Sequence, residues 1–226
     1  MVVWHAATAT PLALNFYEKT FPNVGDIVQN ITWEYTSDNP ELASKFLRMH
    51  FHDCFVRGCD GSILLDSTPT NKAEKDAIPN LSLAGYDVID RVKIALEQEC
   101  PGVVSYADIL ALVARYSVSF QFKMHMWAVP MGRRDGNISR DIEALSDLPS
   151  PFSNFSTLLG DFASKGLDVH DLVVLSDENA RRTVDQMTHQ PLFFKSFAKS
   201  MEKMGAIQVL TGTSGEIRRN CRFVNS

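Results

Sequence analysis

The most informative part of the sequence runs Arg48-Met-His-Phe-His-Asp-Cys-Phe-Val-Arg-Gly-Cys-Asp-Gly-Ser62. On a helix, Arg48 and His52 are four residues apart and therefore share a face, whereas His50 points the other way. An arginine beside a histidine suits a reaction that needs one proton acceptor and one fixed positive charge. The guanidinium also disfavours the imidazolium, which helps to keep His52 neutral and able to act as a base.

The second half of this stretch is rich in oxygen ligands. Asp53, Asp60 and Ser62 offer side-chain oxygens, and Val56 and Gly58 could offer backbone carbonyls. Hard oxygen ligands in one tight loop suit Ca²⁺. The stretch therefore predicts a calcium site directly after the helix.

Cys54 and Cys59 bracket the same loop, so a disulfide between them would hold the ligands in place. A competing interpretation uses His50, His52 and Cys54 as zinc ligands. That alternative is weaker, because no second pair of cysteines at zinc-ligand spacing accompanies them.

A long polar segment, residues 57–80, separates this helix from the next apolar pattern. It is too long for an ordinary connection between packed helices, and a loop of this kind in a compact domain is usually functional. Within it, Glu74 and Asn80 are polar groups that could orient the second nitrogen of the His52 imidazole.

Elsewhere the apolar residues recur with helical spacing, which predicts an all-α, mainly helical fold. Ser105 is a candidate N-cap, Pro101 and Gly205 are candidate stops, and Pro191 precedes the last helix. Short β-prone pieces occur only at 127–130 and 208–210. The expected helices cover about 24–31, 42–55, 88–96, 109–116, 155–162 and the segment from 191 to 204.

Composition limits the class of protein. A chain of 226 residues with 45% hydrophobic and 22% charged residues is long enough for one sizeable domain. A net charge of −5 without a basic block argues against a nucleic-acid partner, and no apolar run approaches the length of a membrane span. Residues 1–14 make a poor signal peptide, although four Asn-x-Ser/Thr sequons, at Asn30, Asn80, Asn137 and Asn154, suit a secretory history.

The stretch from Arg48 to Ser62 resembles the distal signature of the class III (plant secretory) haem peroxidases, and the resemblance extends over nearly the whole chain from about Leu14. It implies a haem-dependent peroxidase fold and an enzyme that reduces hydrogen peroxide while oxidising phenolic donors. It also implies that haem b and calcium are the cofactors, and that the protein is a secreted monomer. Further matching segments are Asn15-Phe-Tyr17, Glu74-Lys-Asp76, Val88-Ile-Asp90, Ala107-Asp-Ile-Leu110, Gly132-Arg-Arg-Asp-Gly136, Leu148 to Phe152, Asp171 to Ser176, Leu210-Thr-Gly-Thr213 and Arg219-Asn-Cys-Arg222.

The resemblance also implies a role for each matching residue. His52 would be the distal acid and base, Arg48 would stabilise charge as the O–O bond breaks, and Asn80 would orient His52 with support from Glu74. Pro149 would border the aromatic-donor site. The distal calcium ligands would be Asp53, Val56, Gly58, Asp60 and Ser62, with Glu74 placed to reach the ion through water.

The sequence departs from the family after Ser176. There the family continues Gly-Gly-His, and that histidine is the axial ligand of the haem iron; here Asp177-Glu-Asn-Ala follows, which resembles a segment near the family's C-terminus. A block of several helices is absent, so the expected fold is incomplete and no axial ligand is assigned. His170 and His189 are the remaining candidates, and both are better explained as surface histidines.

Two family cysteines are also replaced. Phe21 and Tyr106 stand where the partners of Cys100 and Cys221 would be, so these two cysteines are unpaired unless they pair with each other. Ala84 replaces a family arginine in a loop that is one residue shorter, which bears on the placement of Asn80.

The chain then divides into residues 1–13, an unrelated or remnant leader; 14–176, the distal peroxidase portion; and 177–226, the C-terminal helix and tail of the same domain. Two functions compete: a haem peroxidase, and a non-catalytic short relative that arises by splicing or an imperfect gene model. The zinc module is a distant third. For the chain as written, the loss of the axial ligand favours the non-catalytic reading of activity.

Overall fold

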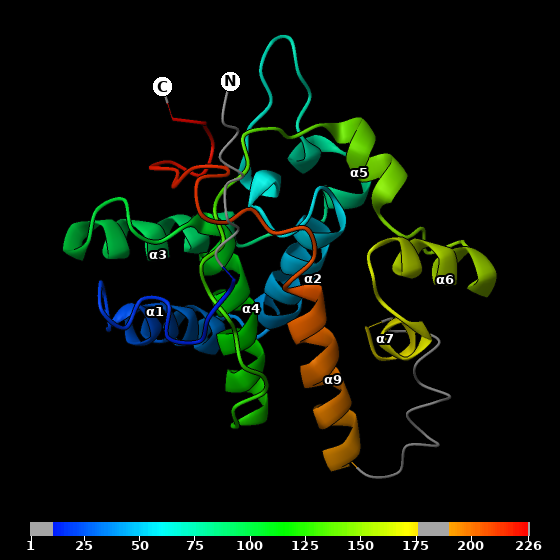
Figure 1. Cartoon of the computed structure of the whole chain (residues 1–226), viewed down its shortest axis with the longest axis horizontal. Coiled ribbons are helices and arrows are strands. Elements are labelled where there is room, and N and C mark those ends of the chain that lie inside the picture. Colours follow the sequence, from blue (N-terminus) through cyan, green and yellow to red (C-terminus); the bar gives the residue numbers. More distant parts are fainter. Residues whose placement is uncertain (1–10, 176–189, 226) are drawn as a thin grey trace, which may run out of the picture.

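The computed structural model of the protein describes residues 11–175 and 190–225, and within them it is helical. Three short 3₁₀ helices, η1 (Ser62–Leu64), η2 (Glu74–Asp76) and η3 (Ile78–Asn80), lie in the long polar segment. The α-helices are α1 (Val24–Asp38), α2 (Leu42–Phe55), α3 (Tyr86–Glu99), α4 (Tyr106–Phe122), α5 (Asp141–Asp147), α6 (Phe155–Ser164), α7 (Val169–Leu175) and α9 (Gln190–Met204) (Figure 1).

Helix α4 forms the centre of the molecule. It packs against α1, α2 and α3, and nearly every side chain of its first four turns is buried. Figure 1 shows it between α1 and α3 on one side and α2 and α9 on the other. Its start agrees with the sequence prediction, because the Ser105 hydroxyl accepts a hydrogen bond from the Asp108 N–H at 3.1 Å.

Helix α2 ends at Phe55, as the pattern predicts, and the chain then reverses sharply. Arg57, Gly58 and Gly61 all have positive φ, and the Cys54–Cys59 disulfide closes the turn. The segment that follows is more ordered than a loop, since η1, η2 and η3 return its polar residues to the end of α2. The reversal brings residues 74–80 beside the helix that carries His52.

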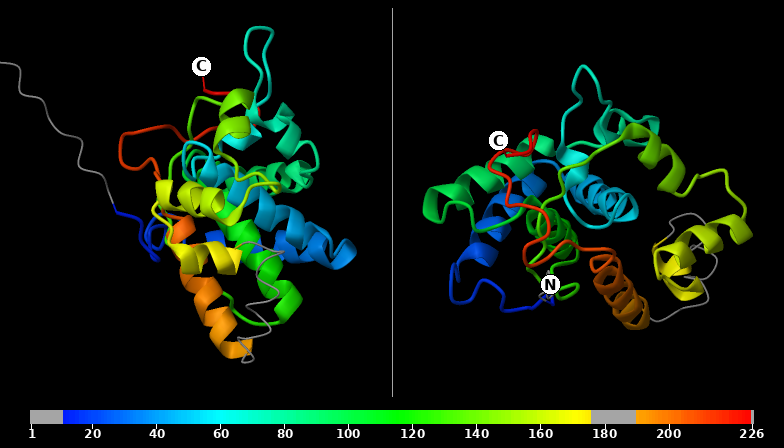
Figure 2. Two further views of the ribbon diagram at one scale, coloured as in Figure 1. Left: turned by 90° about the vertical axis from the view of Figure 1, so that its right-hand side faces the viewer. Right: turned by 45° about the horizontal axis from the view of Figure 1, so that its top comes forward.

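The chain after residue 189 joins the same core as the chain before 176. Met201, Met204 and Ile207 belong to the main hydrophobic cluster, and the Cys59 N–H donates to the Ile207 carbonyl at 3.1 Å. Helix α9 also packs against α7. Both views in Figure 2 show α9 running alongside the body formed by the earlier helices.

The sequence predicts six helices, and the structure has a helix at each of those places. It adds α5 and α7, whose seven residues apiece are too few to show a periodic pattern. The two β-prone pieces form no strand; among the described residues only isolated bridges occur, such as Arg134 with Leu210. No helix in the described part of the chain is both long and apolar enough to cross a membrane.

Candidate active site

Arg48 and His52 meet on one face of α2, as their spacing predicts. The Arg48 Nε donates to His52 Nε2 at 3.2 Å. Two loop groups hold the rest of the guanidinium: Nη1 donates to the Ser82 hydroxyl at 2.7 Å, and Nη2 donates to the Pro79 carbonyl at 2.8 Å. The arginine is therefore fixed from both sides. Sequence reasoning missed Ser82 and Pro79, because a generic serine and a backbone carbonyl carry no recognisable signal.

Asn80 fixes the other side of the imidazole. His52 Nδ1 lies 2.5 Å from Asn80 Oδ1, and Asn80 Nδ2 donates to the Glu74 backbone carbonyl at 2.7 Å. An oxygen acceptor at Nδ1 places the proton there, which leaves the Nε2 lone pair free to accept. The shorter loop around Ala84 thus does not displace Asn80. Glu74 supports it through the main chain rather than through its carboxylate.

The environment keeps His52 neutral. Burial is the largest cause and lowers the pKa of His52 to about 4; the hydrogen bond to Asn80 opposes this, and the charge of Arg48 adds to it. At neutral pH the imidazole is therefore a base that is unprotonated at Nε2, where its lone pair accepts from Arg48 Nε. His50, on the opposite face, is buried in the core, where burial lowers its pKa to about 3.

A second set of polar groups is buried below this pair. The Asp53, Asp60 and Glu74 side chains and the Ser62 hydroxyl lie together at 4% exposure or less. Burial raises the pKa of Asp60 to about 6 and that of Glu74 to about 9, and it raises the pKa of Asp53 as well. The charge of Arg218 lowers the pKa of Asp53 and Asp60 in part, but burial outweighs it, so three carboxyl groups remain costly in such a place.

Several atoms of this set have no partner within the described residues. Both Glu74 carboxylate oxygens and the Ser62 hydroxyl are buried without a hydrogen bond. The Val56 and Gly58 carbonyl oxygens accept none from the described part of the chain either. Unsatisfied buried oxygens around several carboxylates are the donor set that a hard divalent cation requires. These residues therefore fit calcium.

The structure excludes the zinc interpretation. His50, Cys54 and Cys59 do lie close enough together to suggest a metal site, but the two sulfurs form a disulfide and are not thiolate ligands. Both nitrogens of His52 are also engaged, with Arg48 and Asn80. The zinc reading is wrong because it depended on free thiols.

The remaining predicted groups are more scattered. Pro149 is half-buried in the connection between α5 and α6, and its donor-binding role stays a prediction. His170 is exposed in the first turn of α7, where its N–H donates to Asp168, and His189 lies outside the described residues. The absence of an axial ligand stays a prediction.

The two unpaired cysteines do not pair with each other. Cys100 is partly exposed and Cys221 is buried, and both are free. Their replaced partners, Phe21 and Tyr106, are buried in the main core. Aromatic rings therefore occupy space where the family has disulfide sulfurs.

A neutral imidazole base beside a fixed guanidinium can move a proton and stabilise negative charge, and the comparisons with known proteins show the class: an oxidoreductase that acts on hydrogen peroxide. The chain belongs to the peroxidase family: the family model described as "Peroxidase" matches residues 28–222. Peroxidase 3 of Arabidopsis thaliana is 37% identical over 303 aligned positions, which cover 95% of this chain and 92% of that protein. The crystal structure of the TL29 protein from Arabidopsis thaliana has the same fold, with a TM-score of 0.69 at 16% identity over 84% of this chain and 95% of that one.

The alignments also show where this chain is unusual. Because 303 aligned positions exceed the chain's 226 residues, at least 77 positions of Peroxidase 3 have no counterpart here. Peroxidase 1 of Arabidopsis thaliana is 54% identical over a block of 165 residues, which covers 73% of this chain but only 50% of that protein. The chain is therefore a member of the family shortened by an internal gap.

Proposed function

We propose that this chain is a haem peroxidase of the plant secretory type, which reduces hydrogen peroxide and oxidises small phenolic donors. The observation that carries the proposal is the chain of contacts from Arg48 through His52 and Asn80 to the Glu74 carbonyl. Each link prepares the next. Asn80 sets the tautomer, the tautomer leaves Nε2 unprotonated, and Arg48, which donates to Nε2, supplies the charge beside it.

The chain's own residues handle protons and charge. His52 Nε2 takes a proton from peroxide and returns it to the departing oxygen, so that this oxygen leaves as water rather than hydroxide. Arg48, held by Ser82 and Pro79, stabilises negative charge as the O–O bond breaks. When bound, haem supplies the iron at which the oxygen is reduced.

The described residues fit the peroxide side of such a haem and leave its other side unassigned. His50 lies in the core, His125 contacts Arg115, and His170 is exposed on α7. We assign none of these three imidazoles as the axial ligand. The alternative of a non-catalytic short relative rests on this point, and no comparison favours it over the peroxidase function.

Calcium belongs to the same proposal. Asp53, Asp60, Ser62 and the carbonyls of Val56 and Gly58 would bind the ion, and Glu74 would complete its surroundings. The support is the buried, unpartnered oxygens described above. One calcium ion would neutralise the charge of these buried carboxyl groups, next to the C-terminal end of α2, the helix that carries His52.

We also place the protein on the secretory route, as a monomer. The Cys54–Cys59 disulfide suits an oxidising compartment. Asn30, Asn137 and Asn154 are exposed and accessible for glycosylation, whereas Asn80 is buried against His52. The sequon at Asn80 is therefore not a glycan site in the folded protein.

The test is haem titration of the purified full chain, followed by peroxide-dependent oxidation of a phenol. A Soret band and turnover are expected, and His52→Leu should lower turnover by about 10²–10⁴-fold, the usual contribution of a general acid–base. His170→Asn is the matched control, because it replaces an exposed histidine, and it should change neither the Soret band nor the turnover. Failure of the full chain to take up haem would establish the non-catalytic alternative. Sequencing the transcript across Ser176–Asp177 would then show whether a longer form exists.

A further inference from the structure

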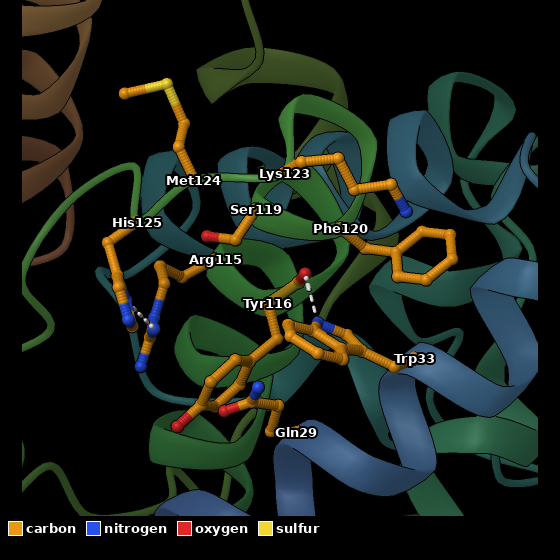
Figure 3. A pocket seen from close by; sticks show the side chains of 9 residues that line it. All are labelled: Gln29, Trp33, Arg115, Tyr116, Ser119, Phe120, Lys123, Met124 and His125. Atoms are coloured by element: carbon orange, nitrogen blue, oxygen red, sulfur yellow. Dashed lines mark hydrogen bonds between the residues drawn. The ribbon is translucent and has the colours of Figure 1, made fainter.

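A cavity of about 260 Å³ lies between α1 and the C-terminal half of α4, and none of its lining residues belongs to the Arg48–His52 site (Figure 3). Trp33 from α1 and Tyr116 and Phe120 from α4 give it aromatic walls. The Trp33 and Phe120 ring centroids are 5.9 Å apart, and the Trp33 indole N–H donates to the Tyr116 carbonyl at 3.1 Å. That hydrogen bond holds the indole in place, so the aromatic walls exist before any ligand arrives.

The charged side chains of the lining are cationic. Arg115 and Lys123 line the cavity, and none of the nine lining residues is acidic. The Arg115 guanidinium lies 3.7 Å from the centroid of the Tyr116 ring, and its Nη1 approaches His125 Nδ1 at 3.3 Å. Within the described ranges Arg115 forms no salt bridge. A partly buried cation without a counter-ion favours an anionic ligand.

Two hydrogen-bond donors in the lining also lack an acceptor. The Arg115 Nε and the Ser119 hydroxyl are buried, and neither has a partner within the described residues. Ser119 is only 4% exposed, so water outside the protein does not compensate its hydroxyl. Figure 3 shows this hydroxyl on the same side of the cavity as Arg115 and His125. Both atoms lie just beneath the cavity wall, so an acceptor group would reach them only after a small shift of the neighbouring side chains.

We propose that this cavity binds a small aromatic carboxylate. The ring would lie against Trp33 and Phe120, and the carboxylate would pair with the Arg115 guanidinium, with Lys123 at the rim. A small shift of the wall would bring the Ser119 hydroxyl within reach of the same carboxylate. The size agrees with a ligand of one ring, because the cavity is smaller than the roughly 300–1,000 Å³ of sites for drug-sized molecules. The aromatic walls disfavour a bare inorganic anion, and the unpartnered donors disfavour a neutral hydrocarbon. This proposal does not depend on haem or on the peroxidase activity.

Calorimetric titration of the purified full chain with 3-phenylpropionate tests the proposal, and 3-phenylpropanamide serves as the neutral isostere. The acid should bind saturably at one site, and the amide should bind at least about tenfold more weakly, because a charge-assisted contact is lost. Arg115→Gln should weaken binding of the acid by about tenfold for the same reason. Arg91→Gln is the matched control: this exposed arginine on α3 is remote from the lining residues, and its loss should leave the affinity unchanged.

Equal affinities for acid and amide, or an unchanged affinity in Arg115→Gln, would overturn the proposal. If Arg115→Gln proves unfolded by circular dichroism, Lys123→Gln and Trp33→Leu decide instead, since both side chains are exposed. Each should weaken binding of the acid, Lys123→Gln by about threefold as expected for an exposed charge. Full affinity in both variants would equally overturn it.

Discussion

His52 illustrates how single residues set the chemistry. Burial and the Arg48 charge lower its pKa, and the Asn80 hydrogen bond raises it, with a net value of about 4. A depressed pKa means that the neutral base is present at every pH above about 4 and is lost only below it. The same imidazole exposed to water would be half protonated near pH 6.5.

These opposing contributions predict the behaviour of two variants. Arg48→Leu removes the neighbouring cation and should raise the pKa of His52, whereas Asn80→Leu removes the compensating hydrogen bond and should lower it. A ¹³C-labelled imidazole followed by NMR from pH 3 to 8 measures both shifts without haem. Shifts of the same sign in the two variants would contradict the assignment of contacts.

The buried carboxyl groups predict a calcium effect that depends on pH. Without a cation, the raised pKa values of Asp60 (about 6) and Glu74 (about 9) mean that the folded chain binds more protons than the unfolded chain. Its stability therefore falls as pH rises from the usual carboxyl range near 4 through these values. Calcium takes the place of the protons, so its stabilisation should be larger at pH 8 than at pH 5.

Thermal unfolding with calcium and with a chelator measures this difference. At 100 times the dissociation constant, calcium should add about 2.7 kcal/mol at pH 8. In Glu74→Gln the side chain at position 74 has no charge for calcium to neutralise. This variant should therefore be more stable than the unmodified chain in chelator, and calcium should stabilise it less. A calcium effect of equal size at both pH values would contradict the site.

At the scale of elements, the position of Asn80 depends on the turn from η3 into α3. Gly85 is the N-cap residue directly before α3 and has a φ of +93°, and a Cβ there would lie 2.4 Å from a Phe46 ring carbon. Phe46 belongs to α2, so this contact sets how closely the loop that carries Asn80 approaches the helix that carries His52. Glycine is needed both for the backbone and for the approach.

Gly85→Ala should therefore destabilise the protein by about 2–5 kcal/mol, because backbone strain and a steric clash add. Gly102→Ala is the matched control: its φ is also positive, at +72°, but nothing lies within 4 Å of the added Cβ. It should cost only the strain, about 1–2 kcal/mol. Urea unfolding of the two variants measures both costs. Equal losses would show that Phe46 is not in contact with the turn.

At the scale of the whole molecule, we expect that the internal gap uncovers apolar surface on the elements around the 176–177 junction. Phe152, Phe155, Val169 and Leu192 are large apolar side chains between 48% and 96% exposed, and they lie in α6, α7, α9 or the segment before α6. Of these elements, α7 and α9 are the ones nearest the 176–177 junction in sequence. An apolar surface of this kind is normally covered by protein.

Restoring the missing segment from a relative after Ser176 should cover this surface. Binding of a hydrophobic fluorescent dye should fall, the melting temperature should rise, and haem uptake should increase, since the axial histidine expected from the resemblance returns with the segment. A Gly/Ser insert of equal length at the same junction is the control and should change none of the three. If the restored chain binds as much dye as the short one, the exposed surface has another cause.

Local spacing alone predicts much of this molecule. The positions of the helices, the shared face of Arg48 and His52, and the oxygen-rich turn after Phe55 all depend on residues within a few positions of one another. Helical periodicity and i,i+4 geometry act over that range. The extensive motif matches similarly indicate the family, which the comparisons show.

Contacts between distant segments were decided only by the tertiary structure. The contacts of Ser82 and Pro79 with Arg48, and the aromatic cavity between α1 and α4, join residues far apart along the chain. The choice of the Glu74 carbonyl rather than its carboxylate joins residues only six positions apart, but it depends on how the loop folds against α2. The Cys54–Cys59 disulfide, which excludes zinc, is local and agrees with the sequence prediction. Sequence patterns report which residues are available; the packing of helices against one another determines which of them meet.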